Sequence, residues 1–140
     1  MKLIEFSIAK DFIALERGAS YYDLHNCFEF QSLSYNPTTQ KLSLFWHRKN
    51  ADWVKPTEPA ELSLLFSGVY LFKAIERDPE LPFTEDDCLD TIGFIWNDML
   101  SEVGFTSNQS GEDCTILSLS FVSGANLKIG AASVDLVVST

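Results

Sequence analysis

The residues best suited to chemistry are the two histidines and three cysteines, because nucleophilic catalysis by a thiol needs a neighbouring base. His25 and Cys27 are two positions apart, and on a strand that spacing places both side chains on one face. A loop histidine beside a buried thiol explains the same pair, since a functional thiol needs identifiable activating surroundings. We therefore predict no catalytic residue and favour a protein that is not an enzyme.

The carboxylates are concentrated in one half of the chain. Residues 1–75 carry eight acids and eight bases, whereas residues 76–140 carry twelve acids and two bases, which accounts for the net charge of −10. Nucleic-acid binding needs clustered Lys and Arg, so this balance argues against a nucleic-acid partner. The asymmetry predicts an acidic surface that docks a basic protein, although acidity also serves simply to keep a small domain soluble. The candidate partner-binding acids are Asp78, Glu80, Glu85, Asp86, Asp87 and Asp90.

The spacing required for metal and cofactor sites is missing. Zinc takes about four nitrogen or sulfur ligands, and the chain has no closely spaced Cys or His pairs to supply them. The run Glu85-Asp86-Asp87, with Asp90 nearby, lacks the alternation and the glycine of an EF-hand loop. An acidic first turn of a helix explains the same residues. The glycines form no phosphate-binding loop, so we predict neither a metal nor a cofactor.

Trp53 is the aromatic residue with the least obvious core role, because it lies in a polar loop that contains Pro56 and Pro59. Tryptophan is enriched at interface hot spots. Burial in the core is the competing interpretation, since most large aromatics pack there. We include Trp53 with the acids as a candidate partner-binding residue.

Alternating apolar residues predict mainly antiparallel strands. Asn36 and Pro37 suit a type I turn between two of these strands, because proline fixes the φ that the turn requires. The last three strands are closely spaced and are typical of a meander. The predicted strands are residues 2–8, 27–35, 41–47, 62–75 (a central strand or a strand pair covered on both sides, with a bulge or bend at Gly68), 115–122, 127–129 and 134–138.

Two short helices complete the predicted elements. Residues 10–17 precede Gly18, a residue type that often ends a helix. A second helix begins at Thr84, which is placed to cap it, with acids in its first turn and an apolar stripe from Leu89 to Trp96. Because glycine is unfavourable inside a helix, an end near Gly93 with residues 94–96 extended is the alternative. The expected fold class is therefore α+β, mainly antiparallel β, as a curved sheet or sandwich-like meander with one or two short helices.

Length and composition indicate one soluble domain covering residues 1–140. No apolar run reaches the ~18 residues that span a membrane, and the N-terminus has no secretory pattern. An odd number of widely spaced cysteines, Cys27, Cys88 and Cys114, indicates reduced thiols rather than disulfides. We therefore expect a cytoplasmic protein that does not associate with membranes.

Four short segments of the C-terminal half are distinctive: Arg77-Asp78-Pro79, residues 82–89, Ile92-Gly93-Phe94 and residues 121–124. Together they resemble parts of small, acidic, β-rich bacterial proteins of uncharacterised families, and some proteins of this general build are immunity proteins that neutralise toxins. The resemblance supplies no catalytic or binding residue. It implies a bacterial protein that only binds.

Three functions remain open from the sequence. The favoured one is a non-catalytic interaction module whose acidic surface docks a basic partner, because opposite charges speed encounter. The alternative is a small-molecule-binding protein, or an enzyme, with a pocket between the sheet and the acidic helix. The third is a subunit of a homo-oligomer that pairs through an exposed strand edge.

Overall fold

The computed structural model describes residues 1–102, 104 and 107–139. Twelve strands and one 3₁₀ turn make up its regular structure: β1 (Lys2–Ile4), β2 (Ser7–Ile8), β3 (Ala14–Arg17), β4 (Ser20–Asp23), β5 (Phe28–Asn36), β6 (Lys41–Arg48), β7 (Glu61–Ser67), β8 (Leu71–Ile75), the turn η1 (Phe83–Asp87), β9 (Leu89–Ile95), β10 (Ile116–Phe121), β11 (Asn126–Gly130) and β12 (Ser133–Ser139). The fold is therefore all-β, and the predicted α+β class is wrong.

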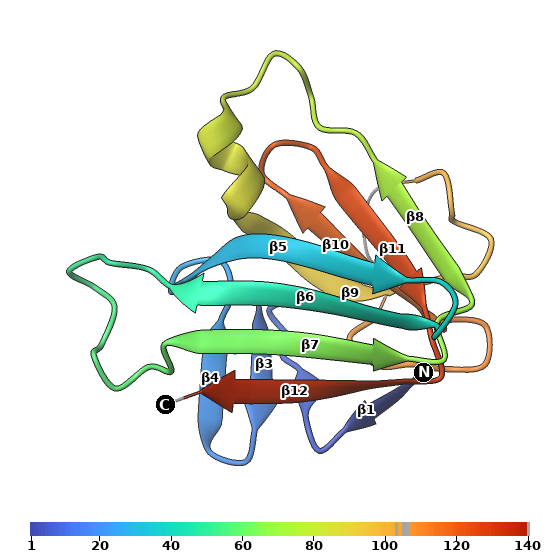
Figure 1. Cartoon of the computed structure of the whole chain (residues 1–140), viewed down its shortest axis with the longest axis horizontal. Coiled ribbons are helices and arrows are strands. Elements are labelled where there is room, and N and C mark those ends of the chain that lie inside the picture. The colour runs from blue at the N-terminus through green and yellow to red at the C-terminus, as the bar shows by residue number, and fades with distance from the viewer. Residues whose placement is uncertain (103, 105–106, 140) are drawn as a thin grey trace.

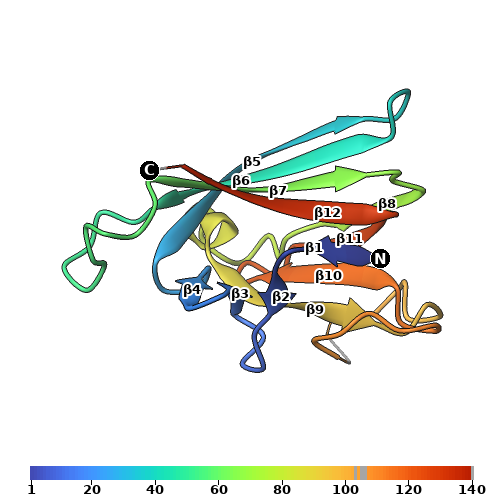
Figure 2. The ribbon, with the colours of Figure 1, turned by 90° about the horizontal axis from the view of Figure 1, so that it is seen from below.

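The strands form three sheets, which we call the front, back and small sheets. The front sheet has the order β1-β12-β7-β6-β5, the back sheet β8-β11-β10-β9 and the small sheet β2-β3-β4. All neighbouring strands are antiparallel except β1 and β12, which are parallel. The front sheet lies across the other two, which occupy the layer behind it (Figure 1) and below it in the second view (Figure 2). Buried side chains from all three sheets form one core.

The alternation of buried and exposed side chains in the front sheet follows directly from its sequence. Leu42, Leu44 and Trp46 on β6 point inward and are at most 1% exposed, as their spacing predicts. Leu44 pairs with Leu64 on β7, which in turn pairs with Leu136 on β12. This row of leucines therefore crosses three strands and covers the front of the core.

The hairpin of β5 and β6 confirms the predicted turn. Asn36 pairs with Lys41, and the Oδ1 atom of Asn36 accepts hydrogen bonds from the backbone N–H groups of Thr38 and Thr39, at 3.0 and 3.3 Å. The predicted bend at Gly68 is also confirmed, but the prediction that the strand pair is covered on both sides is wrong, because β7 buries only alternate residues and β8 is half-buried or exposed. Gly68 has a φ of 66° and joins β7 to β8.

The predicted helix over residues 10–17 is a turn followed by β3. Gly18, with a φ of 57°, sits in the tight turn that joins β3 to β4, where Arg17 pairs with Ser20. A glycine with positive φ suits a hairpin as well as the end of a helix. The hairpin forms because β3 pairs with Tyr21 and Tyr22 of β4, and tyrosine favours strands.

The predicted helix from Thr84 is also wrong. Only the 3₁₀ turn Phe83–Asp87 forms, its N-cap is Pro82, and no side chain caps it. From Leu89 to Ile95 the chain is strand β9, which pairs with β10. Burial of Ile92, Phe94 and Ile95 at 0% exposure favours a strand covered on both faces over a solvent-exposed helix.

Two predicted strand arrangements differ from those in the structure. The segment 2–8 is broken at Glu5, which has a φ of 59°, into β1 and β2 in different sheets. The final meander is also incomplete, because β12 leaves β11 and joins the front sheet instead. The chain crosses between the layers at Ala131 and Ala132.

Within the described residues, no helix has the length and apolar character needed to cross a membrane.

Candidate functional site

An apolar hollow of about 600 Å³ opens at one corner between the front and back sheets, and we call it the corner hollow. The segment between β8 and η1 arches above the free edge of β5 at this corner (Figure 1). Strands from both large sheets and the acidic segment therefore contribute to its walls. The lining residues are Phe30, Ala74, Ile75, Glu76, Arg77, Pro79, Asp86, Phe121, Ala125 and Leu127.

The corner hollow exposes residues that belong to the core face of the back sheet. Ala74 pairs with Leu127, and Phe72 pairs with Ile129, so these four side chains share one face. Ile129 is fully buried, whereas Phe72 and Leu127 are half-buried and Ala74 is exposed. Burial therefore declines along this face toward β8, and the front sheet leaves the corner uncovered.

Aromatic rings form the floor of the corner hollow. The ring centroid of Phe30 lies 5.0 Å from that of Phe121 and 5.2 Å from that of Trp46. Outside the lining, the ring centroids of Tyr35 on β5 and Phe72 on β8 lie 5.2 Å apart. The contact with Trp46 connects the floor to the buried core.

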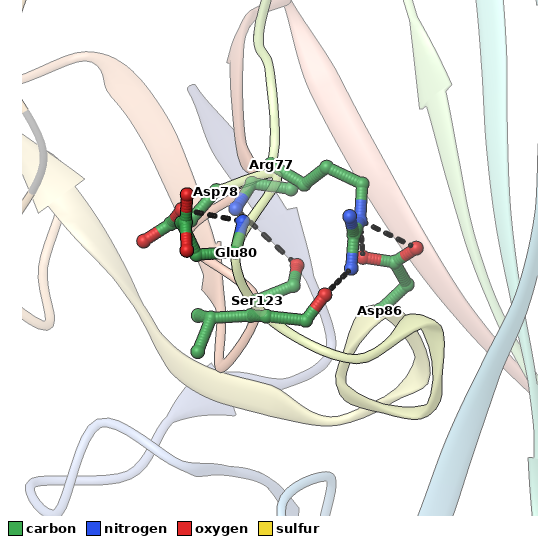
Figure 3. A network of polar contacts seen from close by, with 7 residues as sticks. Arg77, Asp78, Glu80, Asp86 and Ser123 are labelled. Carbon is green, nitrogen blue, oxygen red and sulfur yellow. Dashed lines mark hydrogen bonds and ion pairs between the residues drawn. The ribbon is translucent and has the colours of Figure 1, made fainter.

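One ion pair borders the corner hollow. Nε of Arg77 donates to both carboxylate oxygens of Asp86, at 2.8 and 3.0 Å (Figure 3). Nη2 of Arg77 donates to the carbonyl oxygen of Leu81 at 2.6 Å, and the guanidinium carbon lies 4.8 Å from the ring centroid of Phe83. Hydrogen bonding from Arg77 lowers the pKa of Asp86, which keeps this carboxylate ionised.

The acids around this pair form what we call the acidic rim, namely Glu76, Asp78, Glu80, Glu85 and Asp86. Arg77 is the single base in residues 76–102, which contain nine acids. Because its charge is already engaged by Asp86, the rest of the rim stays negative. The exposed members are Glu76, Asp78 and Glu80.

Backbone contacts hold the acidic rim in place against the β10–β11 turn. The N–H of Asp78 donates to the carbonyl of Ser123 at 2.7 Å (Figure 3), and the N–H of Ser123 donates to the carbonyl of Glu85 at 3.2 Å. Oδ1 of Asp78 accepts from the N–H of Glu80 at 2.9 Å. Two parts of the rim are thus joined through one buried serine.

The structure brings together some of the predicted site residues. Asp78, Glu80, Glu85 and Asp86 lie in the acidic rim, and Asp86 lines the corner hollow. Asp87 ends η1 and Asp90 is exposed on β9, and neither contributes to the lining. The sequence interpretation missed the apolar lining altogether, because Phe30, Ile75 and Phe121 are ordinary strand residues in the sequence.

Trp53 lies elsewhere, in the loop between β6 and β7. It is 68% exposed, and its Nε1–H donates to the carbonyl of Asn26 at 2.8 Å. The competing interpretation of Trp53 as a core residue is therefore wrong. A hollow of about 710 Å³ lies between this loop and β4, but its Arg48 already donates to the carbonyls of Pro56 and Glu58.

The thiol closest to a histidine belongs to Cys88 rather than to Cys27. Sγ of Cys88 lies 3.6 Å from Nδ1 of His25, and Nδ1 lies 2.6 Å from the carbonyl oxygen of Leu89. A carbonyl only accepts, so Nδ1 carries a proton and cannot take one from the thiol. Burial raises the pKa of Cys88, which further opposes a nucleophilic role.

Comparison of the chain with protein-family models, with curated proteins and with solved structures gave no match.

Proposed function

We propose that this chain is a non-catalytic binding protein whose corner hollow and acidic rim receive a basic segment of another protein. The observation that carries the proposal is the uncovered core face at Ala74 and Leu127, bordered by Glu76 and Asp86. Exposed core-like surface marks an interaction site when it is rimmed by polar groups. The segment would place apolar side chains in the corner hollow and its Lys or Arg residues against the rim.

The negative charge of the acidic rim favours a basic protein as the partner over a second copy of this chain. A second copy of this chain would bring two acidic rims together, and like charges placed face to face cost several kcal/mol. Two further exposed apolar residues, Leu81 and Phe83, at 38% and 81% exposure, contact Arg77, which lines the corner hollow. A protein segment can cover such an extended surface, whereas a small molecule would be confined to the hollow.

An immunity-type role is one form of this function. A small acidic protein that covers a basic surface of a toxin needs a rigid binding face and no catalytic group. The backbone contacts of Asp78 and Ser123 provide that rigidity. Opposite charges would also speed the encounter at low ionic strength.

A peptide-display selection tests the proposal. The full chain is presented to a library of random peptides, and the recovered peptides should combine Lys or Arg with apolar residues. Ala74→Trp, which fills the corner hollow from an exposed strand position, should abolish their binding. The matched control Val137→Trp, on the outer face of the front sheet, should leave it unchanged.

Two outcomes would contradict the proposal. The first is a selection that recovers no peptide enriched in basic residues. The second is a set of peptides whose binding Ala74→Trp and Val137→Trp affect equally. Thermal unfolding of both variants shows beforehand that each is folded.

Small-molecule binding is the second candidate, because about 600 Å³ lies within the usual range of ligand pockets, roughly 300–1,000 Å³. The mainly apolar walls and the few polar groups at the rim fit an apolar molecule that carries an amine. A fragment screen followed by NMR would support this candidate if hits shift Phe30, Phe121 and Leu127, and would eliminate it if none does.

A further inference from the structure

We infer that the partner segment binds in extended form, as an added antiparallel strand along the free edge of β8. This inference rests on the proposed function, since it specifies how the basic segment is held. An added strand gains affinity from main-chain hydrogen bonds and specificity from alternate side chains. Both requirements are met by features of β8 and the corner hollow.

The edge of β8 is open. β8 (Leu71–Ile75) pairs only with β11 in the back sheet. Among the described residues, no other backbone group forms a hydrogen bond with residues 71–75. The outward N–H and C=O groups of β8 are therefore available to another strand.

The same strand borders the corner hollow along its inner face. Phe72 and Ala74 project to the core side of the back sheet, together with Leu127. Because side chains alternate along a strand, a segment beside β8 would direct every second side chain over the corner hollow. Strand pairing and apolar burial would thus occur together.

The other free edge near the corner hollow is less suitable. β5 is the edge strand of the front sheet, but its pairing register shifts between Phe30 and Ser32. Such a bulge twists an edge and interrupts regular pairing. β8 pairs with β11 without a shift over its whole length, so β8 is the better template.

The position of the acidic rim fixes where the basic residues lie in such an antiparallel segment. Glu76, Asp78 and Glu80 come directly after the C-terminal end of β8. In an antiparallel pair, that end lies beside the N-terminal part of the added strand. The basic residues should therefore precede the alternating apolar residues. The residue opposite Lys73, which is exposed on the other face, should not be basic.

N-methylated peptides test the inference on the full chain. The probe is the synthetic peptide acetyl-Arg-Lys-Arg-Thr-Val-Thr-Val-Thr-amide, titrated by calorimetry. In one analogue the valine nitrogens are methylated, and in the other the threonine nitrogens that alternate with them. In a strand, alternate N–H groups point to opposite edges. One analogue should therefore lose affinity by about tenfold for each methyl group that removes a main-chain hydrogen bond, and the other should bind like the parent.

Hydrogen exchange supplies a second readout that needs no variant. The bound peptide should slow amide exchange in residues 71–75 and leave residues 28–36 unchanged. The reversed peptide, with its basic residues last, should bind at least about tenfold more weakly, because its cations would lie away from the rim.

Failure of the inference is distinct from failure of the proposed function. If the parent peptide binds but both methylated analogues lose affinity equally, or if protection appears in residues 28–36 instead, strand addition along β8 is wrong and binding of a basic segment still stands. If neither this peptide nor any peptide from the display selection binds, the proposed function is wrong, and strand addition is wrong with it.

Discussion

Arg77 holds Asp86 across nine positions of sequence, with Nε of the arginine 2.8 and 3.0 Å from the two carboxylate oxygens. This pair links the segment after β8 to the 3₁₀ turn, and so fixes the border of the corner hollow. Both side chains remain partly exposed, at 23% and 40%. The contribution of the pair to stability should therefore be that of a surface salt bridge, at most about 1 kcal/mol.

Arg77→Gln should remove the dependence of folding stability on pH that this pair creates. Because Arg77 lowers the pKa of Asp86 in the folded state, the pair stabilises the fold above the pKa of the unfolded chain and loses that effect as pH falls through the folded pKa. Urea unfolding of the wild type and Arg77→Gln from neutral to acidic pH should show a stability difference that disappears in acid. A constant difference would contradict the assignment. Lys73→Gln, also an exposed base, is the matched control.

Lys128 should make stability rise with pH. It is fully buried on β11, and its Nζ donates to Oδ1 of Asn126 at 2.5 Å. Burial, and secondarily the charge of Lys73, lower the pKa of Lys128 below its ordinary 10.5. The unfolded chain therefore binds more protons between the lowered pKa and 10.5, and stability increases across that interval. Unfolding of Lys128→Met should lack this slope, whereas Lys73→Met, which removes only the secondary cause, should reduce the slope without abolishing it.

Gly68 positions β8, and its replacement by alanine should destabilise the fold more than the same replacement at Gly18. Gly18 and Gly68 both have positive φ, at 57° and 66°, so alanine at either costs about 1–2 kcal/mol in backbone strain. A Cβ at Gly68 would also lie 2.8 Å from Cβ of Ala132, whereas Gly18 has open space. Gly68→Ala should therefore lose a further ~1–3 kcal/mol from crowding. Equal losses in chemical unfolding would refute this role for Gly68.

The sequence supports local features of the fold better than distant ones. The β5–β6 hairpin could be predicted because its alternation and its Asn36-Pro37 turn are local signals. Residues 84–95 could not, because Leu89 and Ile92 fit a helical stripe as well as a strand. The choice depends on pairing with β10, more than twenty positions away in the sequence. Strand propensity in such a segment is decided by its neighbours.

The candidate site could also be predicted only in part. The acids of the rim are visible in the sequence as a charge asymmetry, and the structure gathers four of the predicted ones. The apolar lining could not be predicted, since Phe30, Ala74 and Phe121 come from three strands that the topology alone brings together. Lys128 was likewise unremarkable, because alternation with Leu127 and Ile129 predicts an outward side chain, and the outer face of β11 is buried.

The thiols should react slowly. Burial raises the pKa of both Cys27 and Cys88, so little thiolate forms at neutral pH. Alkylation by iodoacetamide, followed residue by residue with mass spectrometry, should be slower than for free cysteine at pH 7 and should accelerate in alkali. Rapid modification of Cys88 below neutral pH would instead indicate an activated nucleophile.

The charge of the acidic rim should govern the rate of association. Glu76→Lys with Glu80→Lys should lower the association rate of the basic peptide by about tenfold or more at low ionic strength, because steering depends on the summed charge. The matched pair Glu112→Lys with Asp113→Lys changes the net charge equally at exposed acids outside the rim. Surface plasmon resonance at low and high salt measures the association rate of each double variant. Equal slowing by both pairs would show that only net charge matters.

The most direct test is an NMR titration of the full chain with acetyl-Arg-Lys-Arg-Thr-Val-Thr-Val-Thr-amide. Binding at the corner hollow should shift the amide signals of Phe30, residues 72–78, Glu80 and residues 121–127, and should leave the Trp53 indole N–H unchanged. Shifts confined to the loop around Trp53 or to the outer face of the front sheet, or no shifts at millimolar peptide, would contradict the corner hollow as the binding site.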